Sequence, residues 1–135
     1  MAKDKTINAI GKRKNAVARA SAKIGTGKVL VNGIPIENMK PEPVMLLLKE
    51  PVLLAGDVAK GLDISVNVSG GGVMGQAQAA RQAIAKALAE KSKALKKIFI
   101  EYDRTLLVSD IRRNEPHKPN ASKRGPRRAK QRSKR

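Results

Sequence analysis

The sequence has no cysteine and no tryptophan, and its 135 residues include one histidine, one phenylalanine and one tyrosine. Without cysteine, disulfide bonds and thiolate metal sites are excluded. His117 stands between Pro116 and Lys118, with no second histidine to complete a zinc site. Because Phe99 and Tyr102 are the only aromatic residues, the sequence disfavours modules that stack bases on a sheet.

Long apolar runs are also missing. The longest, Val44 to Leu48, is far shorter than the roughly 20 residues of a membrane-spanning helix. Charged residues interrupt the N-terminal segment, which therefore does not resemble a secretory signal. We expect a soluble, cytoplasmic protein with no membrane partner.

Acidic residues are scarce, 11 against 29 lysines and arginines. Asp57 and Asp63 are close in sequence, as are Glu101 and Asp103, but neither spacing demands metal binding or acid–base catalysis. A paired-carboxylate nuclease would need a fold that unites distant acids. We therefore expect no enzymatic activity, no cofactor and no metal ion.

Positive charge is what the chain has in excess, and it lies at the two ends. The formal net charge is +18, of which residues 1–28 carry +7, residues 29–110 carry +1 and residues 111–135 carry +10. This distribution is typical of a nucleic-acid binder. A membrane surface is the weaker interpretation, because no basic segment also has a large apolar face. We expect a globular RNA-binding domain at 1–110 and a basic tail at 111–135.

The tail contains too few apolar side chains to fold alone. Pro116, Pro119 and Pro126 favour an extended chain and oppose a helix. At about 3.3 Å per residue the extended tail reaches about 80 Å, enough to leave the domain and thread through RNA.

Alternation of apolar and polar residues predicts strands at 5–10, 16–24 and 62–69, with a short last strand at 106–108. The glycines of Gly25 to Lys28 predict a hairpin that returns the chain as a partner strand at 29–32. Asn32-Gly33 is a further turn signal. Gly11 to Lys14, a glycine and three cations, is read either as a solvated turn or as a phosphate-binding turn.

Helical patterns follow in the second half. A short helix is expected at 44–50, ended or kinked by Pro51, with a further turn at 52–55 closed by Gly56. An alanine-rich helix is expected to follow the segment 70–76 and to end at about Lys91, and another is expected at 93–102 with Leu95, Ile98, Phe99 and Tyr102 on one face. The buried stripe of the alanine-rich helix is expected to comprise Val73, Ala77, Ala80, Ile84, Ala87 and Leu88.

Gly70, Gly71 and Gly72 lie between a predicted strand and a predicted helix, which makes a candidate phosphate cradle. The Lys-Ser/Thr pair of a P-loop is missing, so nucleotide binding is disfavoured. A tight turn without a ligand and a turn that meets an RNA phosphate both stay open.

Several motifs resemble the universal small-subunit ribosomal protein S-nine family, in its order and over nearly the whole chain. They are Gly11 to Arg19, Gly70 to Arg81, Tyr102 to Asn120 and Gly125 to Arg135. The Glu-Pro-His-Lys-Pro-Asn segment at 115–120 resembles archaeal rather than bacterial members.

This resemblance implies an α+β fold, a two-layer α/β sandwich with helices on one face of a mixed sheet. It also implies a left-handed β-α-β crossover, as in the second domain of small-subunit protein S-five, although right-handed crossovers are the general rule. The implied place is the head of the small ribosomal subunit, on the three-prime major domain of its rRNA. Expected partners are that rRNA, peptidyl-site tRNA and neighbouring head proteins such as S-ten and S-fourteen.

The functional residues are expected to be cations, which bind phosphates without reading base sequence. The expected rRNA-binding residues are Lys12, Arg13, Lys14, Arg19, Arg104, Arg112, Arg113, Lys118, Lys123, Arg124, Arg127 and Arg128. The expected tRNA-binding residues are Lys130, Arg132, Ser133, Lys134 and Arg135. Many archaeal relatives have tyrosine at the position of Lys134, so a cationic contact is expected there.

Three hypotheses result. The leading one is a structural RNA-binding constituent of the small subunit that supports peptidyl-site tRNA. The second is a free nucleic-acid chaperone or compaction protein, which the same charge supports. The third is an RNA-processing enzyme that uses Asp57 or Asp103.

Overall fold

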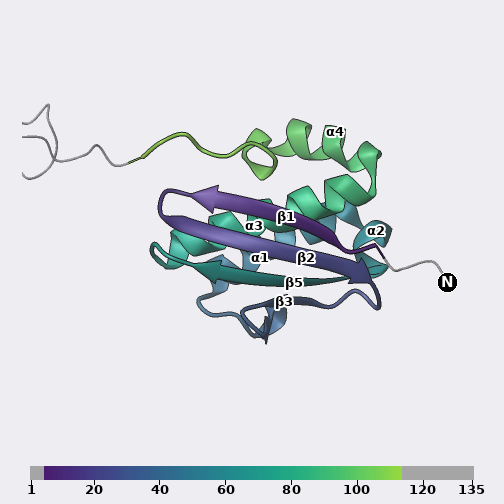
Figure 1. Cartoon of the computed structure of the whole chain (residues 1–135), viewed down its shortest axis with the longest axis horizontal. Coiled ribbons are helices and arrows are strands. Elements are labelled where there is room, and N and C mark those ends of the chain that lie inside the picture. The colour runs from purple at the N-terminus through teal and green to yellow at the C-terminus, as the bar shows by residue number, and fades with distance from the viewer. Residues whose placement is uncertain (1–4, 114–135) are drawn as a thin grey trace, which may run out of the picture.

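A mixed five-stranded sheet and a layer of helices on one of its faces make up the protein (Figure 1). The structure is a computed structural model and describes residues 5–113; residues 1–4 and 114–135 lie outside the described part. The strands are β1 (Ile7–Arg13), β2 (Ala16–Ile24), β3 (Val29–Val31), β4 (Ile34–Pro35) and β5 (Leu62–Ser69). The helices are η1 (Ile36–Asn38), α1 (Glu42–Ala55), α2 (Asp57–Lys60), α3 (Val73–Lys91), α4 (Lys93–Tyr102) and η2 (Arg104–Leu106).

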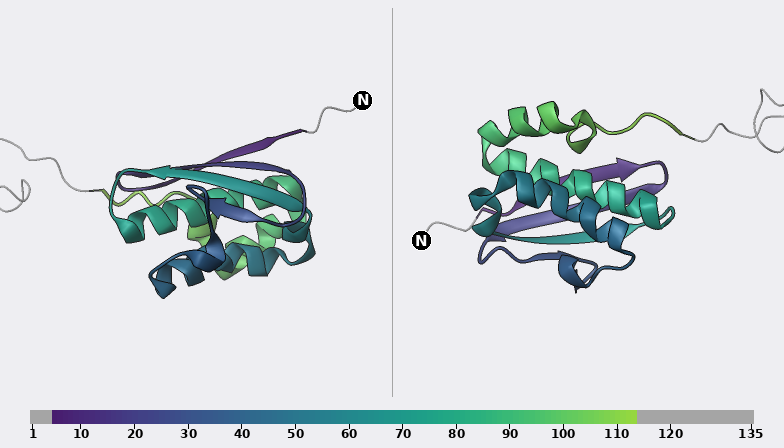
Figure 2. Two further views of the ribbon diagram at one scale, coloured as in Figure 1. Left: turned by 90° about the horizontal axis from the view of Figure 1, so that it is seen from below. Right: turned by 180° about the vertical axis from the view of Figure 1, so that it is seen from behind.

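The sheet has the strand order β1-β2-β5-β3-β4. β3 and β5 are parallel neighbours, and the other neighbouring pairs are antiparallel. The helices of the connection between β3 and β5 lie on the same side of the sheet as α3 and α4 (Figure 2). The expected α+β class with a mixed sheet is confirmed.

Small residues bring α3 close to the sheet. The alternate residues Ala16, Ala18, Ala20 and Ala22 of β2 are buried, and α3 packs against both β1 and β2. At Gly11 of β1, an added Cβ would lie 2.1 Å from the carbonyl oxygen of Ala79. Because real Cβ atoms do not approach that closely, only glycine lets β1 lie against this turn of the helix.

The opposite face of the sheet carries no helix in residues 5–113 (Figure 2). The alternate positions of β1, β2 and β5 that point to this open face are mostly exposed and polar. The residues that pair across it in one row are Asn8, Ser21 and Ser65, and the next row holds Ile10, Arg19 and Asn67.

Three elements have the bounds that the sequence patterns predict, namely 16–24, 62–69 and 93–102, and the alanine-rich helix ends at Lys91 as expected. The turn at Asn32-Gly33 is also confirmed, because both residues have positive φ, 51° and 81°, and join β3 to β4. Gly56 ends α1 with a φ of 58°.

The predicted hairpin between 16–24 and 29–32 is wrong. β5 lies between β2 and β3, so these two strands do not pair. Asp63 of β5 accepts hydrogen bonds from the backbone N–H groups of Thr26, Gly27 and Lys28, at 2.9, 3.0 and 3.0 Å. The glycine-containing segment therefore wraps around the start of β5 instead of reversing the chain onto β2.

Two predicted boundaries are also wrong. β1 runs to Arg13, so the turn before β2 contains only Lys14 and Asn15. α1 continues through Pro51 to Ala55, because Pro51 belongs to a buried stripe with Val44 and Leu48 whose packing outweighs the missing backbone donor.

The expected strand at 106–108 is a 3-10 turn instead. The Asp103 carboxylate accepts hydrogen bonds from the backbone N–H and the hydroxyl of Thr105, at 3.0 and 2.7 Å, which caps that turn. Three residues expected in buried stripes, Val73, Ile98 and Tyr102, are exposed.

Candidate nucleic-acid interface

Cations gather at the end of the sheet where β1 turns into β2. Lys12 and Arg19 are exposed on adjacent strands and lie on the open face as diagonal neighbours, since Lys12 pairs with Val17 and Ile10 with Arg19. Lys14 is exposed in the turn between them and has a φ of 53°. We call Lys12, Lys14 and Arg19 the hairpin cations.

Arg13 points the other way, toward the helices. Its guanidinium forms an ion pair with Asp110, and both side chains are largely buried, at 16% and 15% exposed. Arg13 therefore fastens the segment after η2 to the end of β1, whereas its neighbours Lys12 and Lys14 face solvent.

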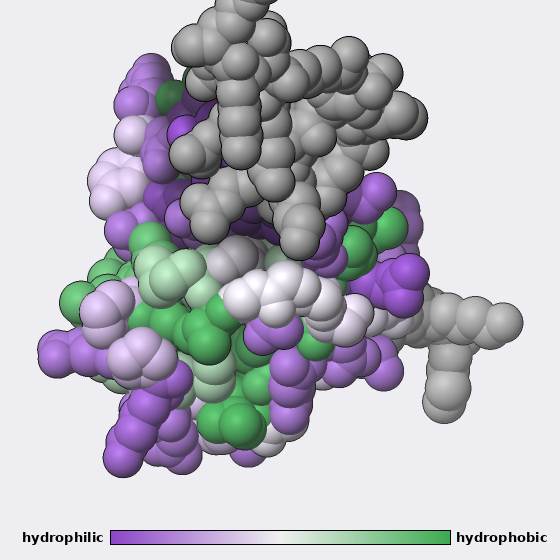
Figure 3. Space-filling model, turned by 90° about the vertical axis from the view of Figure 1, so that its left-hand side faces the viewer, coloured by the Kyte–Doolittle hydropathy of each residue, from purple (hydrophilic) through white to green (hydrophobic). Residues whose placement is uncertain are grey.

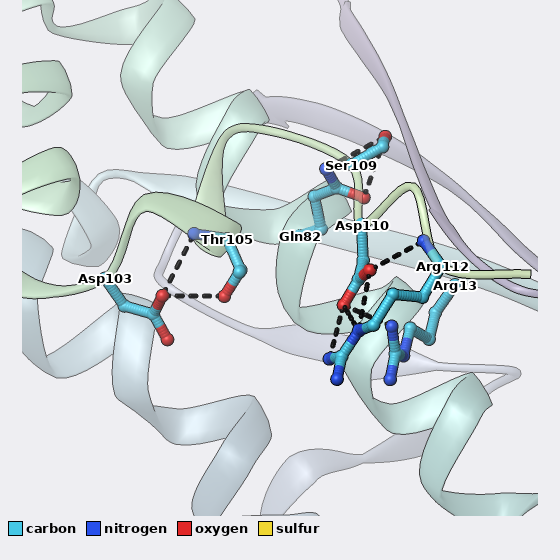
Figure 4. A network of polar contacts seen from close by, with 7 residues as sticks. All are labelled: Arg13, Gln82, Asp103, Thr105, Ser109, Asp110 and Arg112. Carbon is cyan, nitrogen blue, oxygen red and sulfur yellow. Dashed lines mark hydrogen bonds and ion pairs between the residues drawn. The ribbon is translucent and has the colours of Figure 1, made fainter.

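Asp110 also holds Arg112 (Figure 4). Its carboxylate accepts hydrogen bonds from the backbone N–H, the Nε and the Nη2 of Arg112, at 2.9, 3.0 and 2.6 Å. These bonds from Arg112, with the charge of Arg13, hold the pKa of Asp110 far below its ordinary value, although burial opposes the shift. The carboxylate is thus ionised at every physiological pH.

Further hydrogen bonds fix residues 107–113, which we call the tail base. Gln82 of α3 accepts from the backbone N–H of Lys12 at 2.8 Å and donates to the hydroxyl of Ser109 at 3.1 Å. Arg113 donates to the carbonyl oxygen of Lys14 at 3.2 Å. The tail base therefore lies against the β1–β2 turn, beside the hairpin cations.

A polar cleft of about 330 Å³ lies behind this end of the sheet. In it the buried Arg81 of α3 pairs with Glu50 of α1 at 2.6 Å and with Asp103 at 3.1 Å. Burial alone would raise the pKa of Asp103. The hydrogen bonds from Thr105 and, to a smaller extent, from Arg81 outweigh the effect of burial, so the pKa is lowered. This ion-pair cluster joins α1 and α3 to the connection between α4 and η2 and is a structural feature.

The glycine turn meets the β1–β2 turn. Gly70 and Gly71 have positive φ, 79° and 66°, and a Cβ on Gly70 would lie 2.3 Å from the carbonyl oxygen of Asn15. Packing and backbone conformation therefore account for both glycines without a ligand. An added Cβ on Gly72 would meet no atom within 4 Å. The turn therefore packs against the β1–β2 turn, beside Lys14.

The candidate catalytic acids do not form a site. The side chain of Asp57 is 98% exposed and pairs with Lys60. Asp63 accepts hydrogen bonds from backbone N–H groups, and Asp103 accepts one from the guanidinium of Arg81. Among residues 5–113, no group of three His, Cys, Asp or Glu side chains is arranged to hold a metal ion.

Arg104 is exposed at the start of η2, and Arg112 and Arg113 are exposed in the tail base. The other predicted cations lie outside the described residues: Lys118, Lys123, Arg124, Arg127, Arg128, Lys130, Arg132, Lys134 and Arg135, as does Ser133. Sequence reasoning assigned no role to Asp110 or Gln82. The available signal was Asp110 itself, a lone acid before two arginines in a basic stretch.

No helix of the described part is long and apolar enough to cross a membrane.

Comparisons with known proteins show the family of this chain. The family model described as "Ribosomal protein S9/S16" matches residues 11–135. The small ribosomal subunit protein uS9 of Methanococcus vannielii is 48% identical over 131 residues, covering 96% of this chain and 98% of that protein. The uS9 protein of Methanococcus maripaludis strain C7 is 47% identical over the same coverage. The predicted family, with archaeal relatives, is confirmed. The chain therefore belongs to the ribosomal protein S9/S16 family and is a structural, non-enzymatic constituent of the small ribosomal subunit.

Proposed function

We propose that the globular body binds phosphates of small-subunit rRNA, in the three-prime major domain of the subunit head, while the basic tail continues along the RNA to peptidyl-site tRNA. In the described part, the rRNA contacts fall to the hairpin cations, Arg104, Arg112 and Arg113. Asp110 pairs with both Arg112 and Arg13, but the Arg112 side chain is 75% exposed and open to a phosphate, whereas the Arg13 side chain is 16% exposed and supports the contacts indirectly.

The observation that carries this proposal is the anchoring of the tail base. Asp110, Gln82 and the carbonyl of Lys14 hold residues 107–113 against the β1–β2 turn. The tail therefore departs from the body beside the hairpin cations, so one RNA backbone can contact both. A freely hinged tail would give no such continuity.

The tail itself is assigned from its sequence. Residues 114–135 contain nine lysines and arginines and one acid. We propose that Lys118, Lys123, Arg124, Arg127 and Arg128 contact rRNA. The tip residues Lys130, Arg132, Ser133, Lys134 and Arg135 would contact tRNA, with Lys134 making a cationic contact.

Two further proposals concern the fold and its neighbours. The views in Figures 1 and 2 support a left-handed crossover between the parallel strands β3 and β5. In Figure 1 the helices that connect these strands lie behind the sheet, and β5 lies on the side of β3 toward β2.

S-ten and S-fourteen are the proposed protein neighbours in the head.

The test separates the tip from the anchor. Small subunits carrying Ser133→Ala, Lys134→Ala and Arg135→Ala are expected to assemble normally but to bind peptidyl-site tRNA roughly three- to tenfold more weakly, as expected for a few lost charge-assisted contacts. Replacing the exposed Lys96 and Lys97 of α4 by alanine is the matched control. Unchanged tRNA affinity in the tip variant would refute the tRNA contact.

Sedimentation of the full-length protein in high salt checks the rRNA contact against a free nucleic-acid chaperone. Retention with the small subunit is expected. Release at salt concentrations that leave other head proteins bound would favour the chaperone.

A further inference from the structure

Helix α1 has apolar side chains on its buried face and also on a face that the rest of the protein leaves exposed. Its inward stripe, Val44, Leu48, Pro51 and Ala55, is buried in the core. A second stripe points outward. A helix that is apolar around most of its circumference is normally enclosed by other protein.

The outward stripe has the spacing of one helical face. It comprises Met45, Leu46, Lys49, Val52 and Leu53, which we call the α1 face. Leu46 is 54% exposed and Leu53 is 76% exposed, while Met45 and Val52 are partly exposed. Residues one and two turns apart on a helix form a continuous ridge, which is the form that helix-in-groove recognition uses.

Figure 2 places α1 on the outside of the helical layer, on the side away from the sheet. The α1 face is therefore directed away from the open sheet face that carries Lys12 and Arg19. At the end of the molecule where α1 and α3 begin, hydrophobic residues form an exposed surface (Figure 3). A groove of about 190 Å³ is lined by Met39, Val44, Val73 and neighbouring residues, none of which belongs to the α1 face.

Residues 29–69, which include α1 and α2, contain three lysines and five acids, a balance of −2, whereas residues 5–28 carry +7 and residues 70–113 carry +5. Two of these acids are engaged within the body, Glu50 with Arg81 and Asp63 with backbone N–H groups. The α1 face lies between two further acids, Glu42 at the helix start and the exposed Asp57 after its end, and contains one cation, Lys49. An RNA backbone would meet few cations here and would leave the leucines in water.

We propose that the α1 face is a docking surface for a neighbouring small-subunit protein, which contributes aliphatic side chains flanked by lysine or arginine. The aliphatic side chains would cover Leu46 and Leu53, and the cations would pair with Glu42 and Asp57. Strand addition at the nearby sheet edge is excluded by β4, which has two residues, one of them Pro35. This inference rests on the proposed function insofar as rRNA occupies the other face.

Site-specific crosslinking tests it, and the absence of cysteine makes any introduced one unique. Full-length protein with Leu53→Cys, labelled with a maleimide photo-crosslinker, is assembled into small subunits and irradiated. We expect one protein adduct, whose crosslinked peptide contains aliphatic residues and lysine or arginine. An adduct with rRNA, an adduct with a second copy of this chain, or no adduct would overturn the proposal.

A label on the open sheet face distinguishes the two proposals. Asn67→Cys lies beside Arg19 in the ladder and is expected to crosslink to rRNA. If Asn67 reaches rRNA and Leu53 reaches no protein, only the docking surface is wrong. If the labelled protein enters the subunit and Asn67 does not reach rRNA, the proposed rRNA contact is wrong.

A charge-insertion pair gives a second measurement. Leu46→Glu with Leu53→Glu is expected to reduce the crosslinked neighbour in assembled subunits roughly tenfold, the loss typical of a central interface residue, and to leave rRNA affinity unchanged. Ile98→Glu with Ile100→Glu, at exposed apolar positions of α4, is the matched control and is expected to leave the neighbour in place. Equal loss in both double variants, or loss in neither, would contradict a specific surface.

Discussion

At the scale of single residues, the few carboxylates of this basic protein hold its irregular segments in place. Asp63 fixes the segment before β3 through three backbone N–H groups, Asp103 caps η2, and Asp110 fastens the tail base. Asp63 lies near the start of β5, and Asp103 and Asp110 lie in connections, but each of the three accepts hydrogen bonds from backbone N–H groups of a connection. The scarce acids therefore stabilise the positions of the irregular segments.

These three carboxylates predict an acid limit to stability. Hydrogen bonds to Lys28 and Thr26 lower the pKa of Asp63 from its ordinary value of 3.8, and the pKa values of Asp103 and Asp110 are lowered as well. A lowered pKa in the folded state adds stability that is fully present above the unfolded pKa and is lost as the pH falls through the folded one. Urea denaturation should therefore give a constant free energy of unfolding from pH 7 to about pH 5 and a decline below about pH 4.

Asp63→Asn is the variant that checks this cause. It should lower the Tm at pH 7 by roughly 5 °C and flatten part of the acid decline, because a neutral amide accepts the same backbone bonds more weakly. Asp57→Asn is the control, since that carboxylate is exposed and paired only with Lys60. An identical pH profile in Asp63→Asn and the unmodified protein would show that other groups cause the decline.

At the scale of elements, the sequence predicts where strands and helices lie along the chain better than it predicts which strands pair. The alternation in β2 and β5 is a local pattern and predicted the bounds of both strands, and the alanine-rich pattern, also local, predicted α3 and its end. The pairing of β3 with β5 depends on Asp63, which lies 35 residues after the segment it holds. The continuation of α1 past Pro51 likewise depends on packing against distant residues. A local sequence pattern shows neither which distant strand will pair nor which distant residues will pack against a helix.

The candidate site was likewise predicted in part from the sequence. The cationic composition predicted the hairpin cations and the tail, but it gave Arg13 the same role as Lys12 and Lys14. Strand alternation turns Arg13 toward Asp110 and leaves its neighbours exposed. The distinction between an RNA-binding cation and an anchoring one requires the register of β1, which the sequence placed three residues short.

The close contact between β1 and α3 leads to a prediction about glycine. Gly11→Ala would place a Cβ 2.1 Å from the Ala79 carbonyl oxygen and 2.7 Å from the Ala83 nitrogen, both backbone atoms that cannot move alone. We expect a loss of about 3 kcal/mol in the free energy of unfolding, the upper end of overpacking costs. Gly72→Ala is the matched control, because its φ is −97° and its added Cβ meets no atom within 4 Å. Equal stabilities of the two variants in urea denaturation would contradict the packing.

At the scale of the whole molecule, charge and hydrophobic surface are separated. The β1–β2 turn and the tail base are cationic and lie at one end, whereas α1 presents leucines between carboxylates. Of the cations proposed to contact rRNA, six belong to the described residues and five belong to the tail. The proposed electrostatic attraction to rRNA is therefore divided between the body and the tail.

This division predicts how affinity depends on salt. If the full-length chain makes about ten phosphate contacts, the logarithm of its affinity for a small-subunit rRNA fragment should fall with the logarithm of salt concentration at a slope of about −7 to −9. A chain ending at Arg113 keeps the hairpin cations and the tail base but loses a net charge of +8. Its slope should be roughly half as steep, because it keeps six of the eleven cations proposed to contact rRNA, and fewer phosphate contacts release fewer counterions. Filter binding at four or five salt concentrations measures both slopes, and an unchanged Tm confirms that the shortened body is folded. Equal slopes would mean that the body, not the tail, makes most of the phosphate contacts.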